Sequence, residues 1–146
     1  MKDRHLCKAR PLGTRKQWVT GFYAVLGEKT VIIEKEPEKY HDIEAGKSSC
    51  GNRIVEVMPE TVCWCTGSKD KNGKLIFEND ILSGHIDVEF PEDETRKRVM
   101  WHENGWCTNE PGCDDYEELD DFDSENFEVI GNIFEGEFNG KNSKKD

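Results

Sequence analysis

Cysteine and histidine are the residues whose types and spacing first suggest chemistry. Cys63 and Cys65 form a CxC pair, and Cys107 and Cys113 lie further along the chain, near His102. Thiolates and an imidazole in such numbers could hold a tetrahedral zinc ion. Residues two apart on a strand share a face, but CxC lacks the turn that brings a CxxC pair onto one ion. We therefore predict no metal site and no cofactor.

A run of acidic residues suggests a second chemistry, calcium binding. Asp121, Asp123 and Glu125 alternate in the manner of loop ligands. An EF-hand loop starting at Asp121 needs glycine at its sixth position and glutamate at its twelfth. Asn126 and Asn132 stand there instead. A solvated acidic face is the favoured interpretation.

Catalytic groups do not form a recognisable pattern. The four histidines are scattered, at positions 5, 41, 85 and 102, and the chain contains no GxSxG elbow, phosphate loop or HExxH helix. Asp80 is the one acid that stands out, because it begins a predicted strand. Its carboxylate could equally accept backbone N–H groups of the preceding turn and so fix that strand, which is the favoured role. No catalytic residue is predicted, and the chain is expected not to be an enzyme.

Tryptophan offers the remaining candidate for a binding surface. Trp101 and Trp106 flank a predicted turn, and Trp64 lies on an earlier hairpin. Arg96 and Arg98 are close to the first of these in sequence. An aromatic pair beside arginines could stack on bases or clasp a peptide, although packing within the protein is the commoner use of such residues. These five residues form the candidate interaction surface.

Composition limits the elements that can position these side chains. Of 146 residues, 34% are hydrophobic and 35% are charged, and the net charge is −11. So thin a core suits β-sheets with one wet face better than a helical bundle. An acidic surface repels phosphate backbones, although the basic run 96–98 leaves a narrow exception. No apolar run approaches the roughly 18 residues of a membrane span, and no signal peptide is evident, so a soluble cytoplasmic protein with reduced thiols is expected.

Apolar alternation and turn residues predict many short strands. They are expected at 18–26, 30–33, 54–58, 62–66, 75–77, 86–90 and 127–134, with a bulge at Gly131 in the last. Three polar regions are expected to be a loose arm at 1–16, a surface loop at 34–52 and a disordered tail at 136–146. The acidic stretch is expected to form a short helix near 116–122 or to stay a loop.

Two Asn-Gly pairs predict two tight hairpins. Around Asn72-Gly73 a two-residue type I′ turn would place Lys71 opposite Lys74. Around Asn104-Gly105 the same turn would place His102 opposite Cys107, and residue 101 opposite residue 108.

The first hairpin lies within residues 66–82, TGSKDKNGKLIFENDIL, which resembles the signature of the YopX family of phage and prophage proteins, usually met as TGLKDKNGKxIYEGDIV. Asn79 stands where glycine is usual. The segments RPLGTRKQWVTGFY, VMPETV and DFDSENFEVIGNIF resemble other parts of the family, so the likeness covers most of residues 8–134. The signature-turn residues are Asp70, Asn72, Gly73 and Asp80. The resemblance implies a phage or prophage accessory protein, and the family has no settled biochemical role.

Together these observations predict a mainly β protein. Residues 60–135 are expected to form a small antiparallel SH3-like barrel, and residues 1–59 to add strands packed on or beside it. The predicted function is a non-catalytic, oligomeric binding module that meets a host or phage protein and no membrane. A nucleic-acid-associated protein using the local basic spots is the first alternative, and an enzyme with an unrecognised site is the second.

Overall fold

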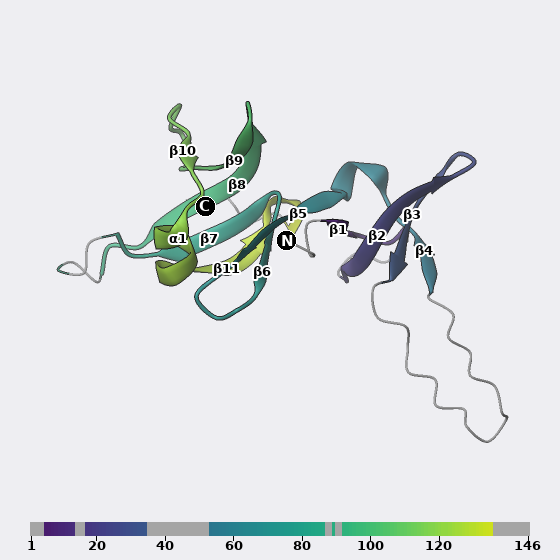
Figure 1. Ribbon diagram of the computed structural model, residues 1–146, viewed down its shortest axis with the longest axis horizontal. Helices are drawn as coiled ribbons and strands as arrows, with labels where there is room; N and C mark the ends of the chain where they lie inside the picture. The colour runs from purple at the N-terminus through teal and green to yellow at the C-terminus, as the bar shows by residue number, and fades with distance from the viewer. Residues whose placement is uncertain (1–4, 14–16, 35–52, 87–88, 90–91, 136–146) are drawn as a thin grey trace, which may run out of the picture. The chain divides into compact units, whose positions relative to one another are not determined.

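A computed structural model of the protein describes residues 5–13, 17–34, 53–86, 89 and 92–135 (Figure 1). The predicted mainly β class is confirmed. The strands are β1 (Leu6–Ala9), β2 (Val19–Leu26), β3 (Lys29–Glu34), β4 (Ile54–Glu56), β5 (Cys63–Lys69), β6 (Leu75–Phe77), β7 (Asp80–Gly84), β8 (Thr95–His102), β9 (Gly105–Asn109), β10 (Glu117–Glu118) and β11 (Phe127–Asn132). One α-helix, α1 (Asp121–Asn126), and the 3-10 turns η3 (Pro59–Thr61) and η4 (Ile133–Glu135) accompany them.

The strands pair into two antiparallel sheets, ordered β4-β3-β2-β1-β5-β6 and β10-β9-β8-β7-β11. Neither sheet closes on itself, so the predicted SH3-like barrel is replaced by open sheets. The chain divides into two compact units, the N-terminal unit (Asp3–Trp64) and the C-terminal unit (from Cys65 onward). Of the loop predicted at 34–52, Glu34 ends β3, while the rest of it, His41 and the tail at 136–146 lie outside the described residues. No helix among the described residues is long and apolar enough to cross a membrane.

The N-terminal unit is built on small apolar residues. Its core contains Cys7, Ala9, Val19, Ile32 and Val57, all buried. β1 pairs with β2 on one side and with the start of β5 on the other. The prediction of a loose N-terminal arm was therefore wrong for β1, because its alternate side chains complete this core.

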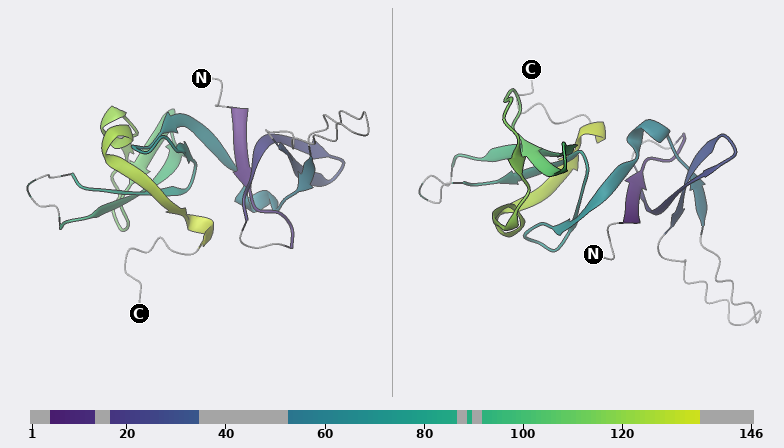
Figure 2. Two further views of the ribbon diagram at one scale, coloured as in Figure 1. Left: turned by 90° about the horizontal axis from the view of Figure 1, so that it is seen from below. Right: turned by 45° about the horizontal axis from the view of Figure 1, so that its top comes forward.

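The C-terminal unit has its own core, to which β6 and the five-stranded sheet both contribute. Ile76, Leu82, Val99 and Phe127 are buried together, and Trp106 packs against them. The chain passes from α1 directly into β11, which pairs with β7 (Figure 2). The predicted bulge in this last strand is confirmed by a register shift between Val129 and Gly131.

Two predicted elements are displaced. The strand expected at 86–90 is absent at its two described positions, since Ile86 is in a bend and Glu89 in a turn. Positions 87, 88 and 90 lie outside the described residues. The strand predicted to begin at Asp80 is β7, where Leu82 packs in the core. The helix forms at α1, later than 116–122, because the Asp120 carboxylate caps it by accepting the Asp123 N–H.

The first hairpin is real, but its predicted turn was wrong. Lys69 pairs with Leu75, so five residues form the loop instead of two. The Gly73 N–H donates to the Asp70 carbonyl at 2.9 Å, and of the Asn72-Gly73 pair only Gly73 has a positive φ, of 84°. The wider loop arises because the Asp70 carboxylate accepts backbone N–H groups inside it.

The second hairpin is also real with a different register. His102 pairs with Gly105 and Trp101 with Trp106, so the loop consists of Glu103 and Asn104. Glu103 takes the left-handed conformation, with a φ of 59°. The two indole rings then meet edge to face with centroids 5.1 Å apart, a cross-strand contact that the predicted register would have lost.

Candidate functional site

The signature turn is held by a buried carboxylate. Asp70 accepts the N–H groups of Asn72 at 2.8 Å and Lys74 at 2.9 Å through Oδ1. Its Oδ2 accepts the Val129 N–H at 2.8 Å, across 59 residues of sequence. The Lys71 N–H donates to the Phe127 carbonyl at 3.0 Å. The turn therefore docks on β11 and satisfies backbone groups along it.

Asp80 makes a second such connection and is fully buried. Its Oδ2 accepts the Phe77 N–H at 2.8 Å, and its Oδ1 accepts the Asn132 side-chain amide at 2.9 Å. Asn79 precedes it with a φ of 71°, a conformation that asparagine tolerates in place of glycine. The Asn79 carbonyl also accepts the Ile133 N–H at 3.0 Å. This carboxylate ties the β6–β7 turn to the end of β11, so its geometry is that of a structural group.

The predicted interaction surface is divided by the strand alternation of β8. Trp101 and Trp106 come together on the face of the sheet that also carries Val99. Arg96 and Arg98 point to the opposite face. The Arg98 guanidinium donates to the Asn79 side-chain oxygen at 2.8 Å, and Arg96 pairs with Glu94 at 3.1 Å. The arginines and the tryptophan pair therefore do not form one surface.

Trp64 belongs to the N-terminal unit and has a different aromatic partner. Its ring centroid lies 5.6 Å from that of Tyr23, with the planes tilted by 51°. Trp64 lies opposite Cys7, which lies opposite Gly21 on β2, so Trp64 and Tyr23 share a face of that sheet. Val25 follows on this face.

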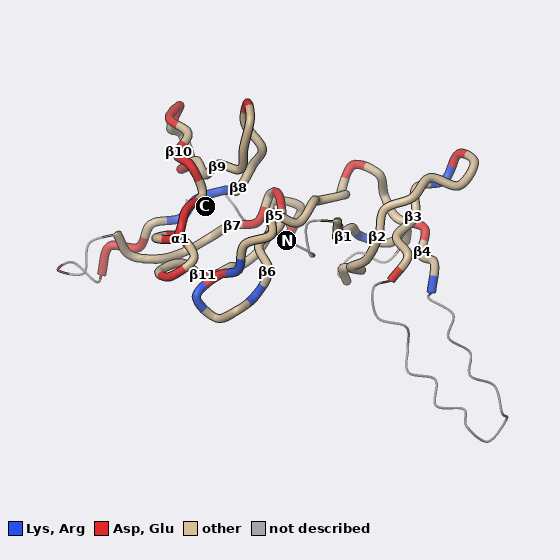
Figure 3. Tube along the Cα trace, in the orientation of Figure 1, with Lys and Arg blue, Asp and Glu red and all other residues tan. Residues whose placement is uncertain are grey.

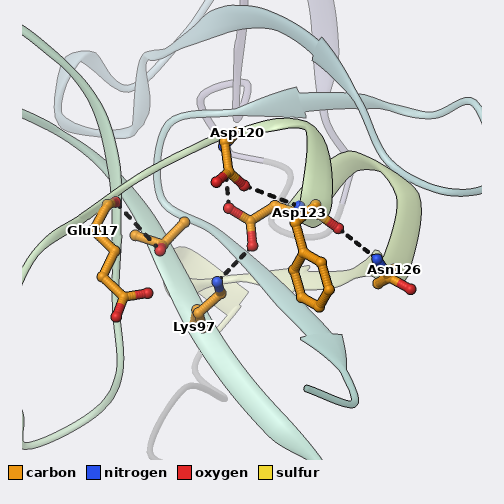
Figure 4. A network of polar contacts seen from close by, with 7 residues as sticks. Lys97, Glu117, Asp120, Asp123 and Asn126 are labelled. Carbon is orange, nitrogen blue, oxygen red and sulfur yellow. Dashed lines mark hydrogen bonds and ion pairs between the residues drawn. The ribbon is translucent and has the colours of Figure 1, made fainter. Parts of the chain in front are cut away.

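An ion pair at the centre of the C-terminal sheet was not anticipated from the sequence. Lys97 Nζ lies 2.6 Å from Asp123 Oδ1, with both side chains nearly inaccessible to solvent. The ammonium also lies 4.5 Å from the Phe127 ring centroid. Figure 4 shows this pair, with Asp120 bound to Asp123 at the start of α1. Two features of the sequence could have pointed to this ion pair. Lys97 lies two residues before Val99 and so shares its strand face, and Asp120-x-x-Asp123 is a helix-capping pattern.

An open pocket lies above this ion pair. Its volume is about 430 Å³. The lining residues are Ile86, Lys97, Glu117, Glu118, Asp120, Phe122 and Asp123. Apart from Lys97, which Asp123 neutralises, the polar lining is acidic, and Ile86 and Phe122 supply apolar walls.

The cysteines and histidines do not converge. Cys63 and Cys65 are both buried on β5, and within the described parts of the chain no three metal-ligating side chains come close enough to hold an ion. His102 stacks on Tyr116 with ring centroids 4.0 Å apart. Burial raises the pKa of the Cys107 thiol above its usual range, and the nearby carboxylates of Glu118 and Glu103 raise it further.

The fold and site define a mainly β protein with two open antiparallel sheets. Its last strand, β11, is hydrogen-bonded by two buried carboxylates, those of Asp70 and Asp80. The family model described as YopX protein matches residues 23–137. The chain therefore belongs to the YopX family. A search of the curated proteins finds no match to this chain.

Proposed function

We propose that the protein is a non-catalytic binding module that works as an oligomer, a phage or prophage accessory protein of the bacterial cytoplasm. The observation that carries the proposal is an exposed apolar patch, here called the Trp64 patch, formed by Tyr23, Val25 and Trp64. Their exposed fractions are 42%, 53% and 41%. Large apolar groups gathered at a surface are typical of sites that meet another chain.

The roles of the signature acids support a module over an enzyme. The carboxylate oxygens of Asp70 and Asp80 accept hydrogen bonds from backbone and side-chain amide groups, and these bonds hold two turns against β11. Carboxylates placed in this way organise the fold. The pocket beside α1 uses other residues.

The nucleic-acid alternative drew on the basic run of β8. Arg96 is paired with Glu94, Lys97 with Asp123, and Arg98 with the Asn79 amide. Side chains engaged in this way are poorly placed to neutralise phosphates. The alternative therefore has less support than the module.

Light scattering of the purified chain at micromolar concentration tests the proposal. We expect a mass that is a multiple of the 16.8 kDa chain, and a shift to the single-chain mass in Trp64→Ser. Trp101→Ser is the matched control, because it removes a tryptophan that is 54% exposed, against 41% for Trp64, from the other unit and should leave the mass unchanged. A single-chain mass for the unmodified protein would contradict the oligomer.

A further inference from the structure

One face of the β8–β9 hairpin combines an exposed indole with a pocket. Trp101, 54% exposed, rests edge to face on Trp106, which is itself packed on the core. The next cross-strand row on this face is Val99, Thr108 and Glu117. Lys97 follows one row further along β8, at the pocket beside α1. The indole and the pocket therefore lie on the same face of one sheet, joined by the row that contains Glu117.

The electrostatic environment of this face is acidic throughout. From Glu103 to Glu135 the chain contains no lysine, arginine or histidine. Figure 3 shows Asp and Glu positions, in red, along β10 and α1. Lys97, which lies on this face two residues before Val99, is neutralised by Asp123 at 2.6 Å. On the opposite face of the hairpin, burial raises the pKa of the Cys107 thiol, and the nearby carboxylates of Glu118 and Glu103 raise it further.

The pocket adds a concave site with both acidic and apolar lining to this acidic face. Glu117, Glu118 and Asp120 supply its acidic lining, while Ile86 and Phe122 supply apolar surface. A lysine or arginine side chain has the matching chemistry, since its methylene stem buries against apolar walls while its charged end meets carboxylates. An exposed tryptophan face attracts the same groups, most strongly the arginine guanidinium.

We propose that this face binds a basic polypeptide segment, with one cationic side chain over the Trp101 ring and another in the pocket lined by Glu117 and Glu118. The inference rests on the proposed role as a binding module and names the partner's chemistry. Nucleic acid is repelled by the same carboxylates. A second copy of this chain, with a net charge of −11, is a poor partner for an acidic face.

The test is a titration of the full chain into a fluorescein-labelled peptide of alternating arginine and glycine, followed by anisotropy. A peptide with glutamine at each arginine position and a single-stranded oligonucleotide are the comparison probes. We expect binding of the arginine peptide alone, weakening as salt rises. Binding of the oligonucleotide, or equal binding of the glutamine peptide, would overturn the proposal.

Variants separate this site from general attraction to an acidic protein. Trp101→Ala and the double variant Glu117→Gln/Glu118→Gln should each weaken binding about five-fold, and Trp101→Phe about two-fold. Glu28→Gln/Glu60→Gln, an exposed pair in the N-terminal unit, removes the same charge and should change affinity less than two-fold. Equal losses in the two double variants, or unchanged affinity in Trp101→Ala, would refute the site. Light scattering on Trp101→Ala separates loss of the peptide site from loss of the oligomer, because the mass of this variant should equal that of the unmodified protein.

Discussion

The two units of the chain bury different chemistry. The N-terminal unit has a core of valine, isoleucine, alanine and cysteine, and Thr61 is its one buried polar residue among those described. The C-terminal unit encloses charged and polar side chains beside its apolar core. They are Thr66, Asp70, Asp80, Lys97, Thr108, Asp123 and Asn132.

This difference indicates how each unit defines its shape. An apolar core is stabilised by burial and tolerates volume-conserving exchanges. A buried polar group is favourable only while its partners stay in place, so it ties the fold to one geometry. The C-terminal unit, which contains the signature, is therefore expected to be the more sensitive of the two to single polar substitutions.

The largest effect is expected from Lys97→Met. Removal of the ammonium leaves the Asp123 carboxylate buried without its counter-charge, which costs about 3–5 kcal/mol. Urea unfolding followed by fluorescence measures the loss. The double variant Lys97→Met/Asp123→Leu should recover most of the stability, and the exposed Lys69→Met should stay within about 0.5 kcal/mol of the unmodified protein. A double variant no better than Lys97→Met would contradict the proposed coupling.

Asp80→Ala should have a slightly smaller effect. Two buried donors, the Phe77 N–H and the Asn132 amide, lose an acceptor. The Asn132 amide keeps a longer contact to the Glu78 carbonyl, at 3.4 Å. Because a buried group that loses its acceptor costs about 1–3 kcal/mol and one of the two donors keeps a partner, the expected loss is about 2–4 kcal/mol. Asp115→Ala removes an exposed carboxylate and is the control in the same urea series. An equal midpoint for both variants would show that Asp80 does not hold β11.

Gly21→Ala tests the packing of the N-terminal unit. A Cβ at this position would lie 2.0 Å from the Ile33 carbonyl oxygen, so backbone must move, at a cost of about 1–3 kcal/mol. Hydrogen exchange should show lost protection in β2 and β3. Gly84→Ala is its counterpart, because the new Cβ would lie 2.6 Å from the Asn126 carbonyl oxygen, and its losses should concentrate in β7 and β11. The same pattern in both variants would mean that the units do not respond separately.

The two hairpin turns provide a smaller and sharper contrast. Gly73→Ala should destabilise by about 1 kcal/mol, since φ is 84° there. Gly105→Ala should be close to neutral, because its φ is not positive and a Cβ would meet open space. Glu103→Gly, at a φ of 59°, should stabilise by up to about 1 kcal/mol. Thermal midpoints measure all three, and a destabilising Gly105→Ala would favour the register with Asn104-Gly105 at the tip.

The smallest effect concerns thiol reactivity. The raised pKa of Cys107 lowers its thiolate fraction at pH 8, so iodoacetamide should modify it more slowly than the exposed Cys113. Glu118→Gln removes one cause of the raised pKa and should increase the rate at which iodoacetamide modifies Cys107 by roughly two-fold. Mass spectrometry of timed samples gives both rates. An unchanged rate in Glu118→Gln would mean that this carboxylate does not act on the hairpin.

Local patterns were enough to predict the elements whose causes are local. The β-branched run around Ile32 and the alternation around Val99 produce strands, and the glycine at position 131 marks the bulge in β11. The signature segment was recognised as a hairpin followed by a strand. The candidate acid Asp80 was also identified, with fixation of the strand as its favoured role.

Features set by distant residues could not be predicted in the same way. The Asp70 carboxylate holds its loop against β11 by accepting the Val129 N–H, and the inward Lys97 ammonium is paired with Asp123 on α1. Likewise the division between Trp101 and the arginines of β8 depends on which face each strand position takes.

The sequence by itself determined that this chain is a β protein of the YopX family with an acidic stretch in its C-terminal part. Strand alternation, turn residues and charge depend only on residues that are close together in the sequence. Only the tertiary structure decided which side chains are buried as pairs and which remain at the surface. Those outcomes depend on contacts between residues far apart in the chain, such as Asp80 with Asn132. Their energies arise only when the sheets have formed and excluded water from the groups between them.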